Sequence, residues 1–326
     1  MKKNLYAKLE EQIMSIDMPE ALKKELLKNV ASLKKEHLNI LITGATGCGK
    51  SSTINALFDM EVAKVGVGVN PETMHIERYD LDGMTLWDSP GLGDGKEADN
   101  RHARGIMSKL HEVDADGQPL IDLVLVILDG SSRDMGTSYQ LINEVIIPHL
   151  GMAESNRLLV AINQADVAMK GRGWDHARNK PMPQLERFLQ EKAASVKKRI
   201  KEATGVDVDP IFYSAGYKET NGVQQPPYNL SKLMYLIVKA TPERKRAIYA
   251  DKTNHDPQMW KSDDEQKDYR KEASESIRFS LSGALAGAKK GSEIGERIGT
   301  LFGGAGRIAG KVIGTVVGGI LGGIFG

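Results

Sequence analysis

The spacing of apolar side chains along the chain changes near residue 38. Before that point, two runs of apolar residues recur at helical spacing, with Asp17 and Pro19 between them as a break and restart. The runs consist of Leu5, Leu9, Ile13 and Ile16, then Leu22, Leu26, Val30 and Leu33. Residues 1–37 are therefore predicted to form an N-terminal helical hairpin.

After residue 38, short apolar strand-like segments alternate with longer amphipathic ones. Strands are expected at 38–43, 73–80, 83–88, 121–128, 157–162 and 209–214, and helices at about 50–58, 97–112, 136–149, 181–203 and 229–240. Only the second and third strands are joined by a tight turn, Leu81-Asp82-Gly83. Since parallel strands need long crossovers, residues 38–242 are predicted to form an α/β domain, with a mostly parallel six-stranded sheet and helices on both faces.

The remainder divides into two segments of different composition. Residues 243–280 are highly charged and contain only short helical runs, which predicts a charged helical connector. Residues 281–326 hold 15 of the 34 glycines, whereas the rest of the chain has an ordinary glycine content. The glycine-rich tail therefore needs an explanation of its own.

A phosphate-binding pattern occupies residues 44–51, GATGCGKS, between the first predicted strand and the first helix after it. Gly44, Gly47 and Gly49 let backbone amides turn inward around a polyphosphate, and the following helix directs its N-terminus at the same anion. Lys50 would reach the β- and γ-phosphates. The predicted nucleotide contacts are Gly44, Ala45, Thr46, Gly47, Cys48, Gly49, Lys50, Ser51 and Ser52. A glycine-rich turn with an incidental lysine is the alternative, which the strand and helix on either side disfavour.

The net charge and the cysteine content exclude several classes of protein. The net charge of +1 excludes a large basic field as the main device of the protein. Cys48 is the only cysteine, which excludes a disulfide framework and a thiolate zinc site and fits a reducing cytoplasm. A helix N-terminus could lower the pKa of this thiol, but an unreactive loop side chain is the favoured interpretation.

Further motifs follow in a fixed order. Asp88-Ser89-Pro90-Gly91 ends the third strand, so Asp88 could hold Mg²⁺ through water and the Gly91 amide could meet the γ-phosphate. Thr73 lies in the loop between these motifs, where it could close over the metal. The predicted metal ligands are Ser51, Thr73 and Asp88.

Two motifs predict which base is bound. Asn163-Gln164-Ala165-Asp166 ends the fifth strand, and the Asp166 carboxylate can accept two hydrogen bonds from the N1 and N2 edge of guanine. Adenine has no such pair of donors, so Asp166 favours GTP over ATP. Ser214-Ala215 ends the sixth strand, where the Ala215 amide could donate to guanine O6.

Over about residues 38–240, these motifs resemble the translation-factor class of P-loop GTPases, most nearly the Era and TrmE-like branch. The phosphate loop GATGCGKSSTINALF is also similar to those of septins and immunity-related GTPases. The resemblance implies a Ras-like G domain, hydrolysis of GTP to GDP and phosphate, and two switch loops that order around the γ-phosphate, with Thr73 and Gly91 as the switch contacts.

The sequence departs from the family pattern at three positions. Gln164 stands where the family usually has lysine, which covers the purine; the long loop that follows carries Lys170, Arg172 and Trp174, which could stack on the base or form a solvated connector. Leu92 follows Gly91 where Ras-like proteins place a water-orienting Gln, so hydrolysis is expected to be slow without a partner or self-association. Gly47 replaces the Asn of potassium-activated relatives, so no potassium dependence is predicted.

The second switch offers charged candidates for catalysis but no clear base. Asp94, Lys96 and Arg101 could act on the γ-phosphate or simply solvate the loop. The catalytic residue is therefore left unassigned.

The glycines of the tail recur every fourth residue, at 283, 287, 291, 295, 299 and 303, then at 306, 310, 314, 318, 322 and 326. This spacing places them on one side of a helix, where another helix can approach closely. The uncharged run 312–326 would span about 22 Å as a helix, less than the roughly 30 Å bilayer core. With five basic and two acidic residues, the tail suits reversible insertion at an anionic membrane, or packing on its own G domain or a second copy.

The leading hypothesis is a cytoplasmic, magnesium-dependent GTPase, with GTP and GDP as substrate and product. Its nucleotide state would control association of residues 281–326 with the inner face of a membrane, or with other copies in a homo-oligomer. One alternative is a ribosome- or RNA-associated assembly factor, which ranks lower because no RNA-binding module or basic surplus is evident. The other is a scaffold that binds GTP with negligible turnover.

Overall fold

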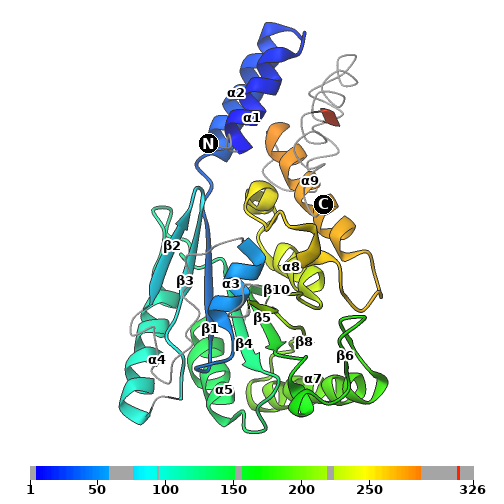
Figure 1. Ribbon diagram of the computed structural model, residues 1–326. Coiled ribbons are helices and arrows are strands. Elements are labelled where there is room, and N and C mark those ends of the chain that lie inside the picture. The colour runs from blue at the N-terminus through cyan, green and yellow to red at the C-terminus, as the bar shows by residue number, and fades with distance from the viewer. Residues whose placement is uncertain are drawn as a thin grey trace.

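The computed structural model describes residues 5–58, 76–93, 95–150, 156–218, 224–287 and 314–315. A six-stranded sheet forms its centre (Figure 1). The strands, in spatial order, are β2(Glu77–Leu81), β3(Met84–Asp88), β1(Leu38–Gly44), β4(Leu123–Asp129), β5(Leu158–Asn163) and β8(Ile211–Phe212). Only β2 runs antiparallel, paired with β3 across the tight turn. The predicted α/β, Ras-like fold class is confirmed.

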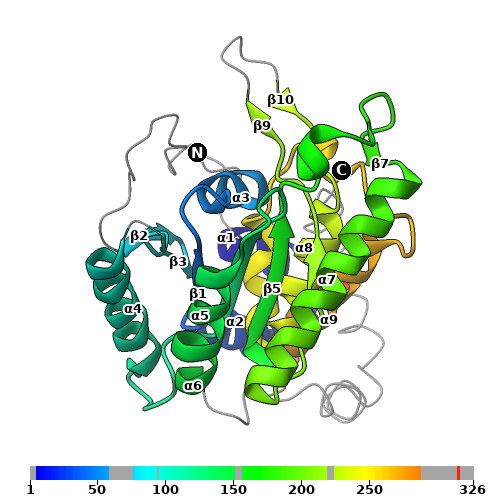
Figure 2. The ribbon, with the colours of Figure 1, turned by 90° about the horizontal axis from the view of Figure 1, so that it is seen from below.

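Helices cover both faces of this sheet (Figure 2). Those of the α/β unit are α3(Lys50–Phe58), α4(Lys96–His111), α5(Gly136–Gln140), α6(Ile147–Leu150), α7(Pro183–Thr204) and α8(Leu230–Ala240). Alternate residues of β1 point to opposite faces: Ile40 and Ile42 join the core beneath α3 and α8, whereas Leu41 joins the core beneath α4 to α7. A central strand buried on both faces in this way is typical of parallel sheets.

Several elements of the structure differ from the sequence prediction. Residues 136–149 form α5, the π-helical segment η1(Leu141–Ile146) and α6 instead of one regular helix. The sixth strand pairs through only two residues, Ile211 and Phe212. Two short hairpins were not predicted: β6(Trp174–Asp175) with β7(Lys180–Pro181), and β9(Tyr217–Lys218) with β10(Gln224–Gln225).

The N-terminal segment forms α1(Leu5–Ser15) and α2(Glu20–Leu33), which lie beside the C-terminal helix α9(Tyr269–Leu285) (Figure 1). The Asn29 side chain donates to the carbonyl of Leu285 at 2.9 Å. The two predicted helices are present, and they pack on a segment more than 230 residues away along the chain. The hairpin and the C-terminal helix therefore share one core with the sheet.

Residues 243–280, predicted as a charged helical connector, bury several of their apolar side chains. They form η4(Glu243–Asp251), η5(Pro257–Trp260) and most of α9, and they bury Ile248, Tyr249, Trp260 and Ile277 in the core. The sequence did not indicate this burial, because Ile248, Tyr249 and Trp260 lie in short 3₁₀ segments, whose spacing gives no helical period.

A buried ion pair joins this segment to the sheet. The Lys245 ammonium lies 2.7 and 2.8 Å from the two carboxylate oxygens of Asp122, and one of these also accepts from the Asn39 amide. Both side chains are buried, so each charge depends on the other for compensation.

The glycine repeat falls almost entirely outside the described residues, as does Thr73. The tail interpretation therefore stays a prediction. Within the described part of the chain, no helix has both the length and the apolar character needed to cross a bilayer.

We expect Lys245→Ala to lower the free energy of unfolding by about 3–5 kcal/mol, because it leaves the Asp122 carboxylate buried without a counter-charge. Denaturant unfolding followed by circular dichroism measures this loss. Lys197→Ala is the control, since Lys197 pairs with Asp207 and Asp209 at the surface and should matter little. Equal, small losses for both variants would show that the 243–287 segment does not depend on this pair.

Candidate functional site

Four of the predicted motifs follow the carboxyl ends of neighbouring strands. The phosphate loop follows β1, Asp88 ends β3, Asn163 ends β5, and Ser214 lies two residues beyond β8. Because these strands are parallel, all four motifs lie at one edge of the sheet. In α/β sheets this edge is where ligands bind.

The phosphate loop has the backbone that its glycines permit. Gly44, Gly47 and Gly49 have φ angles of +152°, +77° and +89°, which L side chains rarely adopt. A Cβ at Gly44 would overlap the Ile127 carbonyl, and one at Gly49 would overlap the Asn163 amide. Substitution of either glycine would therefore displace the loop from the neighbouring strands.

Lys50 begins α3 and is 9% exposed. Its ammonium lies 3.5 Å from the carbonyl oxygen of Gly44 and 3.3 Å from that of Ala45. These are long contacts to neutral acceptors, and among the described residues no carboxylate pairs with this ammonium. The arrangement suits a phosphate that would take up the charge.

Asp88 and Ser51 fit a hard divalent cation. The Asp88 carboxyl is 1% exposed; one oxygen lies 3.5 Å from the Ser51 hydroxyl, and the other has no hydrogen-bond partner among the described residues. Burial raises the pKa of Asp88 to about 6, while the charge of Lys50 acts in the opposite direction. A buried, under-coordinated carboxylate next to a hydroxyl is a donor set that Mg²⁺ accepts. Thr73, the third predicted ligand, lies outside the described residues.

Asn163 connects three loops of the site. Its side-chain Nδ2 donates to the Cys48 carbonyl at 2.9 Å, and its Oδ1 accepts from the Ala215 amide at 3.0 Å. Its backbone carbonyl accepts from the Gly130 amide at 2.8 Å. A single buried residue thus ties the phosphate loop to the loops that follow β4 and β8.

The predicted role of the Ala215 amide differs from its place in this structure. The sequence suggested donation to guanine O6, whereas here the amide donates to Asn163. Asp166 is half-buried. It directly follows Ala165, whose amide donates to the Tyr213 carbonyl at 3.1 Å. The base contacts of Asp166, Ser214 and Ala215 remain predictions.

Gln164 takes a left-handed backbone conformation, with φ +61°. Its Nε2 donates to the Gly47 carbonyl at 2.7 Å, and its Oε1 lies 3.4 Å from the Ser131 hydroxyl. The glutamine is therefore extended across the phosphate loop, although it lacks the charge of the usual lysine. Although Gln164 replaces the usual lysine, its side chain links the base motif to the phosphate loop.

Cys48 is fully buried, and burial raises the pKa of its thiol to about 11. The nearby Lys50 charge only partly opposes this effect. The thiol is protonated at neutral pH, which supports the interpretation as an unreactive loop side chain.

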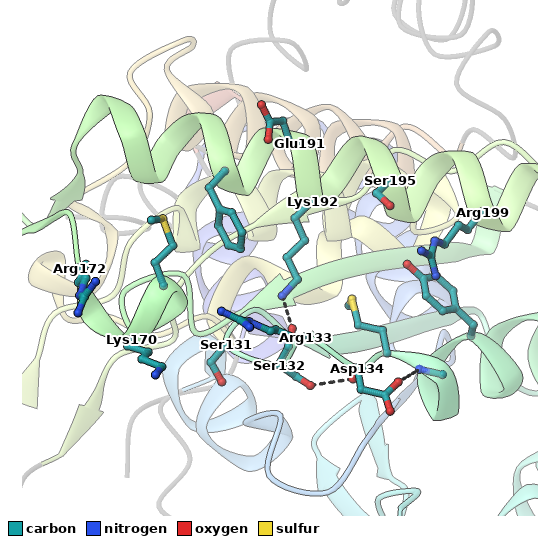
Figure 3. A pocket seen from close by; sticks show the side chains of 15 residues that line it. Ser131, Ser132, Arg133, Asp134, Lys170, Arg172, Glu191, Lys192, Ser195 and Arg199 are labelled. Carbon is teal, nitrogen blue, oxygen red and sulfur yellow. Dashed lines mark hydrogen bonds between the residues drawn. The ribbon is translucent and has the colours of Figure 1, made fainter.

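The loop after the base motif carries three predicted stacking candidates, and one of them, Trp174, is buried. Trp174 is 6% exposed and meets the Tyr228 ring edge-on, at 5.4 Å between centroids. Lys170 and Arg172 instead line a pocket of about 1030 Å³ between this loop, the Ser131–Gly136 segment and α7 (Figure 3). Of the predicted stacking residues, Trp174 is thus committed to the core.

Lys192 crosses this pocket and was not predicted as a site residue. Its ammonium lies 2.6 Å from the carbonyl oxygen of Gly130. It lies at the same distance from that of Ser132 (Figure 3). Burial lowers its pKa, while the charge of Asp129 acts the other way. Lys192 thereby anchors the loop that contacts Gln164. No local sequence pattern marks it, because its partners are backbone groups some 60 residues away.

Among the second-switch candidates, Asp94 lies outside the described residues, and Lys96 and Arg101 are exposed on α4. Leu92 is buried against the phosphate loop, where its carbonyl accepts from the Thr46 amide at 3.0 Å. The described residues therefore add no water-orienting side chain at position 92.

The sheet order, the phosphate loop and the motifs at its edge define a G domain of the P-loop GTPase class. In agreement, residues 39–164 match the sequence family described as "50S ribosome-binding GTPase". This chain therefore contains a P-loop GTPase G domain, with the phosphate loop, the Asp88 motif and the first part of the base motif inside the matched range.

Relatives share about half of this chain. Protein YkfA of Escherichia coli (strain K12) is 30% identical over 159 residues, which is 47% of this chain and 50% of YkfA. Translocase of chloroplast 126 of Physcomitrium patens is 31% identical over 172 residues, 51% of this chain and 14% of that protein. The tRNA modification GTPase MnmE of Marinomonas sp. (strain MWYL1) is 28% identical over 189 residues, 56% of this chain and 39% of MnmE. The chain thus spans half or less of the length of these curated relatives.

Two solved structures resemble this chain at lower sequence identity than these relatives do. Toc33 of Arabidopsis thaliana, in complex with Mg²⁺ and GMPPNP, has a TM-score of 0.43 at 16% identity, covering 71% of this chain and 96% of that one. Era of Aquifex aeolicus bound to GDP and AlF₄⁻ has a TM-score of 0.38 at 16% identity, covering 66% and 68%.

Proposed function

We propose that this protein binds GTP with Mg²⁺ and hydrolyses it to GDP and phosphate. The observation that carries the proposal is the pair of side-chain hydrogen bonds through which Asn163 joins the phosphate loop to Ala215. In this proposal, the pair holds the phosphate side and the base side of one site at a fixed separation. The name of the relative MnmE, a tRNA modification GTPase, supports the same activity.

Each half has a defined task in this proposal. The amides of residues 47–52 surround the phosphates, and Lys50 neutralises their charge. Ser51 and Asp88 hold Mg²⁺, with Thr73 as a further ligand, and the metal supplies charge neutralisation at the β- and γ-phosphates. Asp166 accepts from guanine N1 and N2, while Asn163, Gln164, Ser214 and Ala215 shape the base side.

Turnover in this proposal is slow for the isolated chain. Leu92 is apolar and buried, so it cannot orient the attacking water. A partner or a second copy of the chain would supply the missing water-orienting group. The nucleotide state then controls association of residues 281–326 with the inner face of a membrane or with other copies.

The base assignment is tested with Asp166→Ala in the full chain. Loss of the carboxylate removes two guanine hydrogen bonds and leaves the donors of the base unpaired, so GTP affinity should fall at least tenfold. Calorimetric titration with GTP and ATP measures the effect, and Lys197→Ala, which removes only a surface ion pair with Asp207 and Asp209, serves as the control. Equal affinity of the unaltered chain for GTP and ATP would contradict the base assignment. Unchanged GTP binding by Lys50→Ala would contradict the assignment of residues 44–51 as the phosphate-binding loop.

The tail proposal is tested by flotation with anionic liposomes. The full chain, loaded with a GTP analogue, should float, and a chain ending at Gly287 should remain below, because it lacks the glycine repeat but keeps α9 complete. Gly287 is chosen because Leu285 and Ala286 are buried in the fold, so a shorter chain would also lose core residues. Equal behaviour of the two chains would contradict membrane association of the tail.

A second candidate, an RNA-associated GTPase, is favoured by one structural observation. Arg133, Lys170 and Arg172 are exposed and line the pocket beside the base motif (Figure 3). Phe188 also lines this pocket. Cations next to an aromatic ring are typical of sites for single-stranded nucleic acid. Phosphate release measured with liposomes and, separately, with poly(U) distinguishes this candidate from the membrane proposal and from a scaffold without turnover.

A further inference from the structure

The segment after β3 is clamped between the phosphate loop and α4. On the side of the phosphate loop, the Leu92 carbonyl accepts from the Thr46 amide at 3.0 Å, and the Leu92 amide donates to the Gly44 carbonyl at 3.4 Å. On the side of α4, the Gly93 amide donates to the Asp99 carboxylate at 2.8 Å. The backbone around Gly91 therefore has little freedom in either direction.

Gly91 lies against the phosphate loop so closely that no side chain fits. A Cβ at this position would lie 2.5 Å from the Cα and amide nitrogen of Thr46 and would overlap its hydroxyl. The obstacle is backbone, which cannot move aside like a flexible side chain. Contacts with the phosphate loop on one side and with α4 on the other thus set the position of Gly91.

His102 makes the contact on the far side. It lies on α4, is 7% exposed, and its Nδ1 is 3.0 Å from the Gly91 carbonyl oxygen. A carbonyl only accepts hydrogen bonds, so Nδ1 must carry the proton in this arrangement. The helix itself is fixed in the core by Ile106 and Leu110, so the imidazole is held in place rather than free to follow the loop.

We propose that His102 is a positioning residue for recognition of the γ-phosphate. By holding the Gly91 carbonyl, it sets the backbone of the segment whose Gly91 amide meets a triphosphate. The inference rests on the proposed function and goes beyond it, since it assigns the discrimination between GTP and GDP to a helix residue outside every motif. A diphosphate has no γ-phosphate to meet the Gly91 amide, so loss of the His102 contact should leave GDP affinity unchanged.

The alternative is that His102 merely fills space in the core, and three variants separate the two roles. His102→Leu fills much of the volume without a donor. His102→Asn places its amide nitrogen near the position of Nδ1 and can restore the bond, whereas the amide of His102→Gln lies one bond further along. Arg104→Ala, at an exposed position of the same helix, is the control.

The measurement is the affinity of each full-length variant for GDP and for a non-hydrolysable GTP analogue, with Mg²⁺ present. His102→Leu and His102→Gln should lose about 2- to 12-fold in analogue affinity with GDP affinity retained, which is the effect of one hydrogen bond. His102→Asn and Arg104→Ala should match the unaltered chain. Retained GDP binding also shows that each variant is folded.

The proposal is overturned if both nucleotides lose affinity by the same factor in His102→Leu and His102→Gln, or if His102→Asn fails to recover the analogue affinity. If His102→Leu does not fold, the comparison of Asn with Gln decides the question on its own. Failure of the unaltered chain to bind either nucleotide would instead contradict the proposed function, so the two failures are distinguishable.

Discussion

The side-chain amide of Asn163 is the contact on which the arrangement of the site depends. It donates to one loop and accepts from another, and it lies at the carboxyl end of β5. Gly49 must lack a side chain because Asn163 occupies the space that a Cβ would take. Two loops separated by more than 160 residues thereby share one support.

Around this contact, polar links connect the site to the outer helices. Lys192 on α7 holds the carbonyls of the loop after β4, Ser131 in that loop meets Gln164, and Gln164 reaches Gly47. On the other side of the phosphate loop, the segment through Leu92 is held by Thr46 and by α4. Both groups of contacts include the phosphate loop, one through Gly47 and the other through Thr46.

The sequence was informative where chemistry is local and uninformative where it depends on distant partners. The glycines and Lys50 are recognisable because a phosphate loop needs them at fixed spacing, and the sheet followed from apolar runs such as 121–128. The burial of part of the segment 243–280 was not evident from the sequence, because Tyr249 and Trp260 lie in short 3₁₀ turns without a helical period. Trp174 was an open candidate for stacking until its partner Tyr228, more than 50 residues away, was known. His102 and Lys192 bond to backbone carbonyls, which leave no trace in the sequence.

The most direct test of this account is the GDP affinity of Asn163→Ala, measured by calorimetry beside Asn179→Ala. Asn179 also donates to two backbone carbonyls, those of Pro226 and Pro227, but in a loop away from the phosphate site. The account predicts a loss of about 10- to 100-fold for Asn163→Ala, because two hydrogen bonds disappear and buried groups are left unpaired, and little change for the control. Equal affinities for the two variants would contradict the claim that Asn163 holds the two halves of the site together.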